Sequence, residues 1–290
     1  MQNVEGSMEG KTCVITGTTS GIGKETALAL ARRGASVLMV ARDQERGQSA
    51  AAEIRQRAPQ GSVELLVADL ASQADVRRLA AQVLAVHDRV DVLVNNAGVA
   101  KFERQLTPEG LEVMFATNHL APFLLTHLLL TALEHGAPSR VVNVASDIHS
   151  MVRAIPWDDM QAERRFSGFR HYALTKLMNV LFTYELAERV KGSGVTVNCL
   201  TPGHLDTRLG RDARGPFALF LLFSRLWMSS AEQGSETSVF LASSPDVASV
   251  SGRYFGRCRP KESSKLSHDR RAARRLWELS VELSGLVGSM

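Results

Sequence analysis

The stretch Thr12-Cys-Val-Ile-Thr-Gly-Thr-Thr-Ser-Gly-Ile-Gly23 joins a short apolar run to a turn that holds three glycines. The run is typical of a strand buried on both faces, and the residues after the turn have a helical pattern. In such a unit, Gly17, Gly21 and Gly23 allow a tight turn, close approach of the backbone to a pyrophosphate, and close packing of the helix. The helix N-terminus adds free N–H groups and a partial positive charge. The pattern therefore favours dinucleotide binding over a plain turn.

The same alternation of short apolar runs and longer helical patterns continues along the chain. Strands are predicted over 13–16, 37–40, 63–67, 90–94, 140–144 and 195–200. Helices are predicted over 23–33, 44–57, 72–87, 111–133 and 169–191. Strands that alternate with helices form a parallel sheet with helices on both faces. We therefore expect an α/β fold with a doubly wound, Rossmann-type parallel sheet, and a length of 290 residues suits a single domain.

The composition excludes several classes of protein. A net charge of +4 is modest for this length, and basic residues are not interleaved with aromatic ones, so we expect no nucleic-acid partner. Cys13, Cys199 and Cys258 lie far apart, and we expect reduced thiols, with no disulfide framework and no metal site. Residues 1–11 lack the pattern of a signal peptide, so we expect a cytoplasmic location.

Two segments outside the alternating pattern leave alternatives open. Residues 217–228 are strongly apolar but too short to span a bilayer. They are interpreted either as a helix packed in the core or in a dimer, or as a flap over an apolar substrate within a variable segment of about 204–228. Residues 253–290 are interpreted as a basic C-terminal tail, which is either a solvated face or a surface that meets anionic lipid headgroups.

The residue after the second predicted strand bears on the choice of cofactor. An acidic residue there would accept hydrogen bonds from a ribose 2′-hydroxyl and repel a 2′-phosphate. This chain has Arg42, whose guanidinium can pair with a 2′-phosphate, and this favours NADP(H) over NAD(H). Asp43 follows directly, and a solvated arginine at the start of a helix is the alternative. Lys24 can add positive charge near the same phosphates.

Polar and small residues also follow the third and fourth predicted strands. Asp69 can hydrogen-bond the adenine end of a dinucleotide, while Asn95-Asn-Ala-Gly98 gives small residues where the backbone must pass the cofactor. Either segment could be only a turn. Ligands in such sheets bind at the carboxyl ends of the strands, and this placement favours cofactor contact.

Tyr172 and Lys176 lie one helical turn apart in His171-Tyr-Ala-Leu-Thr-Lys176, a spacing that also arises by chance on amphipathic helices. The reference pKa of a phenol is about 10, and an ammonium nearby favours the phenolate and lowers that pKa. Lowering it to about 7 takes roughly 4 kcal/mol. Ser146 ends the fifth predicted strand, where its hydroxyl can donate to a carbonyl oxygen or cap a turn. Asn118, polar in an apolar helix, can hold a water that relays protons to Lys176.

Together these residues make the chain resemble the short-chain dehydrogenase/reductase superfamily. The residues in the family's order are Thr16-Gly-x-x-x-Gly-Ile-Gly23, Asn95-Asn-Ala-Gly98, Asn118, Ser146, Tyr172-x-x-x-Lys176 and Pro202-Gly203. The resemblance implies a catalytic tetrad of Asn118, Ser146, Tyr172 and Lys176, in which Tyr172 is the acid/base and Lys176 also holds the nicotinamide ribose. With the residues argued above, the predicted cofactor-binding set is Gly17, Ser20, Gly21, Ile22, Gly23, Arg42, Asp69, Leu70, Asn95, Ala97, Gly98, Tyr172, Lys176, Pro202 and Gly203.

Three stretches are similar to the retinol dehydrogenase branch of that superfamily: residues 141–146, 177–187 and 274–280, although Ala145 stands where a serine is common. Members of this branch often reduce apolar aldehydes with NADPH. The resemblance implies an NADP(H)-dependent oxidoreductase that interconverts an apolar aldehyde or ketone and its alcohol. In the reductive direction we expect NADPH to deliver hydride to the carbonyl carbon, Tyr172 to protonate the oxygen and Ser146 to stabilise it.

Two other functions stay open at this point: an alcohol-oxidising dehydrogenase, and a non-catalytic NADP-binding sensor or scaffold. The expected partners are a small apolar carbonyl or alcohol substrate and, through the helices that begin at Leu111 and Phe169, further copies in a homodimer or homotetramer. Peripheral membrane contact through the basic segment is a further candidate interaction.

Overall fold

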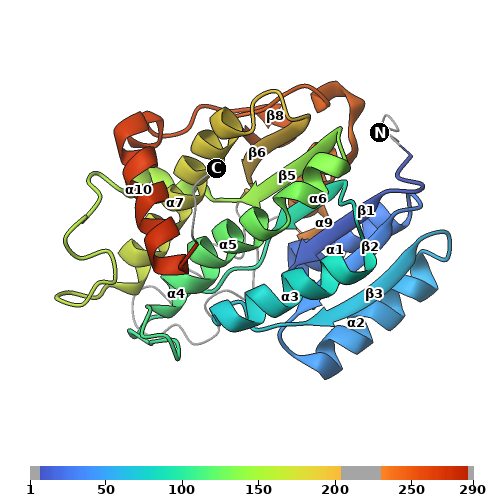
Figure 1. The fold of residues 1–290 in the computed structure, drawn as a ribbon, viewed down its shortest axis with the longest axis horizontal. Coiled ribbons are helices and arrows are strands. Elements are labelled where there is room, and N and C mark those ends of the chain that lie inside the picture. The colour runs from blue at the N-terminus through green and yellow to red at the C-terminus, as the bar shows by residue number, and fades with distance from the viewer. Residues whose placement is uncertain (1–6, 204–229, 287–290) are drawn as a thin grey trace.

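The computed structural model describes residues 7–203 and 230–286. The described residues form an eight-stranded sheet in the order β3-β2-β1-β4-β5-β6-β7-β8, which is parallel except for its last pair (Figure 1). The strands are Thr12–Thr16 (β1), Ser36–Ala41 (β2), Ser62–Val67 (β3), Val92–Asn95 (β4), Ser139–Val144 (β5), Val195–Thr201 (β6), Arg253–Gly256 (β7) and Arg259–Pro260 (β8). The strand order reverses between β1 and β4, so the switch point of the sheet lies at their carboxyl ends, where ligands bind in folds of this kind.

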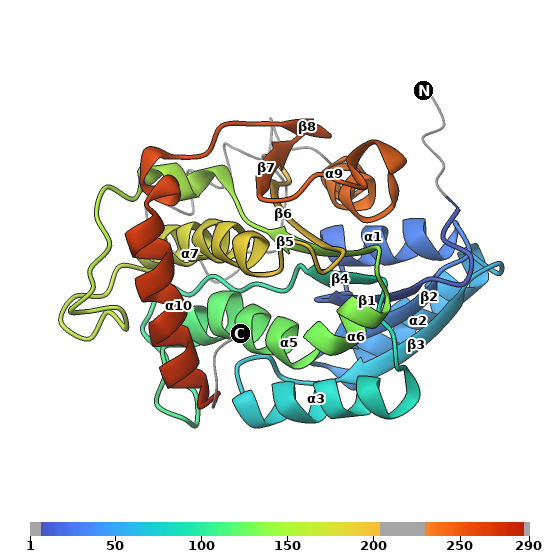
Figure 2. The same ribbon diagram turned by 45° about the horizontal axis from the view of Figure 1, so that its top comes forward.

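Helices cover both faces of the sheet (Figure 2). One apolar core lies between the sheet and α1 (Gly21–Ala31), α2 (Gln44–Arg57) and α9 (Ala231–Ser243). The second core lies on the other face, under α3 (Gln73–Val86), α5 (Ala121–Leu128), α6 (Leu130–His135) and α7 (Gly168–Arg189). The remaining short elements are α4 (Val113–Phe115), η1 (Ala116–Leu120), η2 (Asp147–Met151), η4 (Pro245–Val247) and η5 (Lys265–His268), and α10 (Arg270–Ser284) ends the described chain.

The predicted doubly wound, single-domain fold is confirmed. Each of the six predicted strands begins and ends within two residues of an observed strand, from β1 to β6. The physical reason is visible in β1, whose five residues are all buried, because a parallel strand with helices on both faces has no solvent side.

The predicted helix over 111–133 is wrong as one continuous element. Leu106 and Glu112 form an isolated antiparallel bridge, so the chain is still extended where the helix was expected to begin. Helix α4 is followed by η1, a π-helical turn, and Pro122 lies at the start of α5. Proline has no N–H to donate, so a helical ladder cannot run unbroken through it, and the turn before it is wider. Leu129, with φ −93° and ψ 1°, separates α5 from α6.

The segment interpreted as a basic tail contributes β7, β8 and α10 to the fold. Strand β7 extends the sheet by pairing in parallel with β6. Helix α10 turns Ala272, Ala273, Leu276, Trp277, Ser280 and Ser284 inward. The basic residues of the segment that lie at the surface are Arg253, Arg257, Arg259, Lys261, Lys265, Arg270, Arg271, Arg274 and Arg275.

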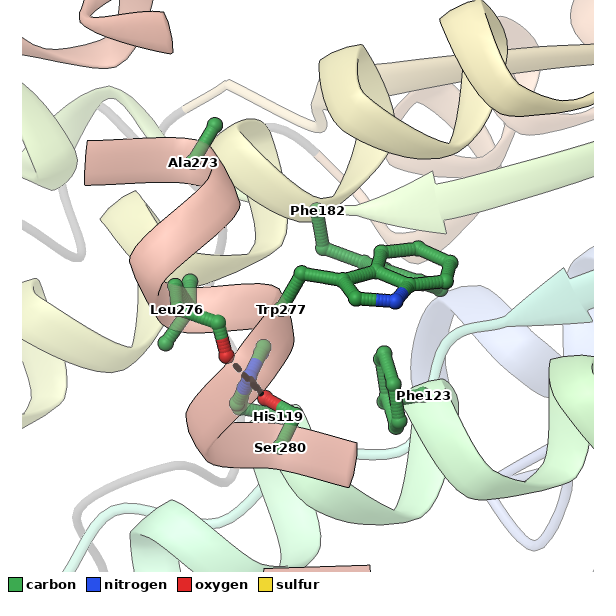
Figure 3. A pocket seen from close by; sticks show the side chains of 7 residues that line it. All are labelled: His119, Phe123, Phe182, Ala273, Leu276, Trp277 and Ser280. Atoms are coloured by element: carbon green, nitrogen blue, oxygen red, sulfur yellow. Dashed lines mark hydrogen bonds between the residues drawn. The ribbon is translucent and has the colours of Figure 1, made fainter. Parts of the chain in front are cut away.

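Figure 3 shows how α10 is attached to the body of the protein. The Trp277 indole meets the ring of Phe123 edge-on at 4.9 Å between centroids and lies 6.1 Å from the ring of Phe182. Beside this cluster, Nε2 of His119 lies 2.8 Å from Oγ of Ser280. The gap among these side chains is too narrow for a water molecule, so it is a packing seam and not a ligand site.

Residues 204–228, with the apolar run 217–228, lie outside the described residues, so both interpretations of that run stay predictions. Among the described helices, none is long and apolar enough to cross a membrane. Cys13, Cys199 and Cys258 are free thiols, and the first two are buried as expected.

Candidate active site

The glycine-rich turn lies at the carboxyl end of β1 and opens α1. Gly17 and Gly21 have φ of +74° and +62°, the left-handed region that favours glycine. A Cβ added to Gly21 would meet nothing within 4 Å, so its backbone is open to an incoming group. Ser20 takes the N-cap position of α1 without a capping side-chain hydrogen bond, and the first turn, which includes Ile22, holds no acidic residue. This helix start suits a phosphate, because its free N–H groups face no competing carboxylate in that turn.

The turn is held in shape by Asn96, a residue that sequence reasoning did not select for cofactor binding. A Cβ on Gly23 would lie 2.3 Å from the Gly17 carbonyl oxygen and 2.4 Å from Nδ2 of Asn96, so no larger residue fits there. Nδ2 of Asn96 donates to the carbonyl oxygens of Thr16 and Gly17 at 2.8 and 3.2 Å. The Thr16 hydroxyl oxygen accepts from the backbone N–H groups of Asn96 and Ala97, each at 3.0 Å.

Asn95, which sequence reasoning did select, has its side chain in the interior. Its Nδ2 donates to the Thr126 hydroxyl at 3.0 Å and to Oδ1 of Asn143 at 2.9 Å. Successive residues of a strand point to opposite faces, which separates the roles of Asn95 and Asn96. The doubled asparagine was the visible signal, but only the strand register decides which of the two braces the glycine turn.

Arg42 follows β2 and is exposed. The neighbouring Asp43 caps α2, since its Oδ1 accepts from the Arg46 N–H at 2.9 Å. Lys24 forms an ion pair with Glu53 of α2. The carboxylate that follows Arg42 is therefore engaged by the backbone, and Lys24 by another carboxylate.

Asp69 and Leu70, after β3, are both partly buried in a tight turn. Oδ1 of Asp69 accepts from the Ala71 N–H at 3.0 Å, and the Asp69 N–H donates to Asp75 at 2.9 Å. The turn that sequence reasoning kept as an alternative is present, and it leaves Oδ2 of Asp69 without a hydrogen bond from the described residues.

Three of the predicted site residues come together around Gly98. A Cβ added there would lie 3.5 Å from Oδ1 of Asn118 and 3.5 Å from Nζ of Lys176. Asn118 is fully buried in the π-helical turn. Its Oδ1 accepts from the Val99 N–H at 2.7 Å, and its Nδ2 donates to the Val99 carbonyl at 2.9 Å and to the Thr175 hydroxyl at 3.1 Å. Both amide hydrogens of Asn118 are thus engaged, and the hydrogen bonds tie the β4 loop to α7.

Lys176 and Tyr172 lie on one side of α7 with the ammonium over the phenol ring, 5.6 Å from its centroid. Lys176 is only 3% exposed, and its Nζ donates to the Val144 carbonyl at the end of β5, at 3.0 Å. Burial lowers the pKa of Lys176 to about 8 and raises the pKa of Tyr172 to about 12. The expected lowering of the tyrosine pKa is therefore absent from the protein alone, because the cost of desolvating a phenolate dominates.

Ser146 lies where β5 ends, as predicted, and its backbone is extended. Its hydroxyl oxygen accepts from the Ile148 N–H at 3.4 Å and so caps η2, one of the two roles that the sequence left open. At the end of β6, the Gly203 N–H donates to the Thr201 hydroxyl at 3.3 Å. Gly203 has φ +83° and a free Cβ direction, which suits the Pro202-Gly203 turn.

The residues at these strand ends fit a nicotinamide dinucleotide. Gly21 leaves room for the backbone of α1 to meet a pyrophosphate, and Gly98 leaves room beside Asn118 and Lys176. Arg42 lies at the surface after β2, and the carboxylate beside it, Asp43, is engaged in capping α2. A helix N-terminus, a glycine-rich turn and an exposed guanidinium are groups that bind the phosphates of a dinucleotide.

The chain is similar to known proteins along nearly its whole length. The sequence profile of the family described as short chain dehydrogenase matches residues 11–215. Human retinol dehydrogenase 14 is 42% identical in an alignment that covers 97% of this chain and 88% of that protein. Human retinol dehydrogenase 13 is 41% identical, with 97% and 86% covered.

Solved structures agree as well. An uncharacterized protein from Mycobacterium paratuberculosis has a TM-score of 0.81 at 34% identity, with 98% of this chain and 97% of that chain covered. The RhlG/NADP active-site complex of Pseudomonas aeruginosa has a TM-score of 0.70 at 25% identity, with 88% and 97% covered. With a family match over residues 11–215 and relatives of the same kind along nearly the whole length, the chain belongs to the short-chain dehydrogenase/reductase family of oxidoreductases, in its retinol dehydrogenase-like branch.

Proposed function

We propose that the protein is an NADP(H)-dependent oxidoreductase that interconverts an apolar aldehyde or ketone and its alcohol, with Tyr172 as the acid/base. The observation that carries the proposal is the meeting of Asn118 and Lys176 at Gly98, with the Lys176 ammonium over the Tyr172 ring. A binding module would have no use for a lysine that is 3% exposed beside a tyrosine. Buried ionisable pairs with shifted pKa values are typical of catalytic sites.

The glycine turn, Arg42 and Gly98 would hold the cofactor, and Lys176 would meet its ribose. When bound, a nicotinamide cofactor supplies or accepts the hydride. Tyr172 has a pKa of about 12, so at neutral pH it carries the proton that a reduced carbonyl oxygen needs. Ser146, at the end of β5, would donate to the same oxygen, where charge develops.

The preference for NADP(H) rests on Arg42. The guanidinium is exposed, and Asp43 is engaged in capping α2, which weakens its repulsion of a phosphate. The Asp43 carboxylate is also held toward the start of α2, because it accepts a hydrogen bond from the Arg46 N–H at 2.9 Å. This arrangement favours a 2′-phosphate over a bare ribose.

An apolar substrate is supported by two features. The apolar run 217–228 follows the Pro202-Gly203 turn in sequence, and Met151, at the end of the η2 turn that Ser146 caps, is 59% exposed. Several relatives also carry the name retinol dehydrogenase, which denotes an apolar alcohol as substrate. Hexanal, nonanal and retinal form a graded panel of apolar aldehydes for the assay.

The test is the Tyr172→Phe variant, assayed by loss of NADPH absorbance with each aldehyde. We expect turnover to fall by at least about 10²-fold while the Kd for NADPH stays unchanged. Tyr184→Phe is the matched control, because Tyr184 lies farther along α7 and its hydroxyl contacts Ser263 at 2.7 Å. Turnover of Tyr172→Phe equal to that of the unsubstituted protein would refute the assignment. NADPH binding without turnover of any aldehyde would favour the sensor alternative.

A further inference from the structure

His149 is a buried residue that the proposed reaction does not use, three residues after Ser146 on η2. It is 2% exposed, and both ring nitrogens have partners. Nε2 lies 3.0 Å from the backbone N–H of Ser264, which can only donate. Nε2 must therefore be the bare nitrogen, and Nδ1 carries the proton.

The proton on Nδ1 is directed at the backbone of Ser146. Nδ1 lies 2.7 Å from the Ser146 carbonyl oxygen, which also accepts the His149 backbone N–H at 3.1 Å. The sheet ends one residue earlier, where the Ala145 N–H donates to the Leu200 carbonyl at 2.8 Å. Among the residues that the structure describes, the hydroxyl of Ser146 has only a 3.4 Å contact with the Ile148 N–H to orient it. The backbone carbonyl is thus the better-anchored part of Ser146, and His149 anchors it.

A second set of contacts fixes Asp147, the first residue of η2. Its Oδ1 accepts from the Tyr254 hydroxyl at 2.9 Å and from the Lys261 ammonium at 2.7 Å. The buried Tyr254 ring also meets the His149 ring edge-on, at 5.1 Å between centroids. Tyr254, Lys261 and Ser264 all belong to the C-terminal segment, more than one hundred residues away in sequence.

Electrostatics agrees with a neutral His149. Burial is the largest cause that lowers its pKa, and the charges of Lys261 and His268 act in the same direction. The Ser146 carbonyl and the Asp147 carboxylate oppose that lowering. A neutral imidazole is the form that can accept from Ser264 and donate to Ser146 at once.

We propose that His149 is a positioning residue, whose Nδ1–H tautomer, fixed by the Ser264 N–H, holds the Ser146 carbonyl and thereby aims the Ser146 hydroxyl at the substrate oxygen. The proposal rests on the proposed function, since it requires Ser146 to act on the substrate. A hydroxyl misplaced by about 1 Å can cost roughly 10²-fold in rate. His149 touches neither substrate nor cofactor in this account.

The test is a double-mutant cycle between His149→Phe and Ser146→Ala, with kcat measured for nonanal and NADPH. Phenylalanine keeps the ring beside Tyr254 and removes both hydrogen bonds. We expect His149→Phe to lower kcat by about 10- to 100-fold without changing the Kd for NADPH, and Ser146→Ala to lower it by roughly 10²-fold or more. The double variant should be no slower than Ser146→Ala alone. His149→Asn, which keeps an N–H donor toward the Ser146 carbonyl, should recover part of the loss.

Three results would overturn the proposal. The first is an unchanged kcat in His149→Phe. The second is a kcat in the double variant that is lower than that of Ser146→Ala by the same factor as His149→Phe shows alone, because His149 would then act independently of Ser146. His127→Phe, another histidine-to-phenylalanine change among aromatic rings, controls for general effects of the exchange on folding. Full activity of Ser146→Ala would instead refute the proposed role of Ser146 itself.

The third result does not depend on any variant. Imidazole ¹⁵N chemical shifts of the unsubstituted protein report which nitrogen of His149 carries the proton. We expect protonated Nδ1 and bare Nε2, with and without NADPH. The opposite tautomer would refute the proposal even if His149→Phe fails to fold.

Discussion

Replacing Lys176 by methionine is expected to stabilise the protein in the absence of cofactor while abolishing its activity. Lys176 is 3% exposed, and burial lowers its pKa from 10.5 to about 8. At about 1.36 kcal/mol per pKa unit, the buried ammonium costs about 3 kcal/mol of folding free energy at pH 7. Methionine fills similar space without a charge. It also gives up the hydrogen bond to the Val144 carbonyl, worth about 1 kcal/mol. The expected net gain is about 2 kcal/mol, or roughly 4 °C in Tm.

The gain should depend on pH in a defined direction. The pKa of Lys176 is lower in the folded than in the unfolded protein, so the unfolded protein binds more protons between pH 8 and pH 10.5. The buried ammonium lowers the free energy of unfolding of the unsubstituted protein at pH 7. This free energy therefore increases as the pH rises through that window. Near pH 10 the two proteins should be about equally stable.

The assay is urea unfolding without cofactor, followed by circular dichroism at pH 7 and pH 10. Lys191→Met is the matched control, because Lys191 is exposed and its replacement should change the free energy of unfolding by less than about 0.5 kcal/mol at either pH. Lower stability of Lys176→Met at pH 7, or a gain that is the same at both pH values, would refute the reasoning.

Three further outcomes are expected. Asn96→Ala removes the hydrogen bonds that shape the glycine turn. The Kd for NADPH, measured by fluorescence titration, should therefore rise at least about tenfold. An unchanged Kd would show that the turn keeps its shape without Asn96. Arg42→Ala should raise the KM for NADPH about tenfold or more and leave the KM for NADH unchanged, and equal effects on both would contradict the 2′-phosphate contact. Alcohol oxidation should speed up between pH 6 and pH 8, by up to roughly tenfold per unit, because the phenolate fraction of Tyr172 grows with pH. A flat profile would argue against Tyr172 as the base.

Much of the fold could be predicted because buried strands are visible in the sequence as short apolar runs. Strands β1, β2 and β4 lie between two helical layers, and all of their residues except Ser36 are buried. The helix over 111–133 was harder, since its apolar residues satisfy a helical pattern while Pro122 and the Leu106–Glu112 bridge interrupt it. Tertiary pairing decided that segment, and a local pattern does not record tertiary pairing.

The C-terminal elements escaped prediction for a different reason. Helix α10 opens with Arg270 and Arg271 and includes Arg274 and Arg275, so its charge dominates its pattern. Its inward side combines Leu276 and Trp277 with four small residues, Ala272, Ala273, Ser280 and Ser284, so few bulky apolar side chains mark this face in the sequence.

Site residues were predictable as positions and less so as contacts. Spacing and order placed Ser146 at the end of β5, and Tyr172 and Lys176 on α7. The sequence cannot tell that Asn95 points inward while Asn96 braces the turn, because a shift of one residue in register exchanges their faces. It also cannot show that desolvation exceeds the effect of a nearby ammonium on Tyr172, because that balance depends on burial.

The C-terminal segment is connected to two of the proposed catalytic residues through neighbouring histidines. His119 follows Asn118, and its Nε2 lies 2.8 Å from the Ser280 hydroxyl of α10. His149 anchors Ser146, and its Nε2 accepts from the Ser264 N–H at 3.0 Å. Each histidine is almost completely buried, so each contact is made in a place from which water is excluded and where an unpaired partner would be costly. The surface of this segment is basic, but its inner side supplies hydrogen bonds to His119 of η1 and His149 of η2, next to two of the proposed catalytic residues.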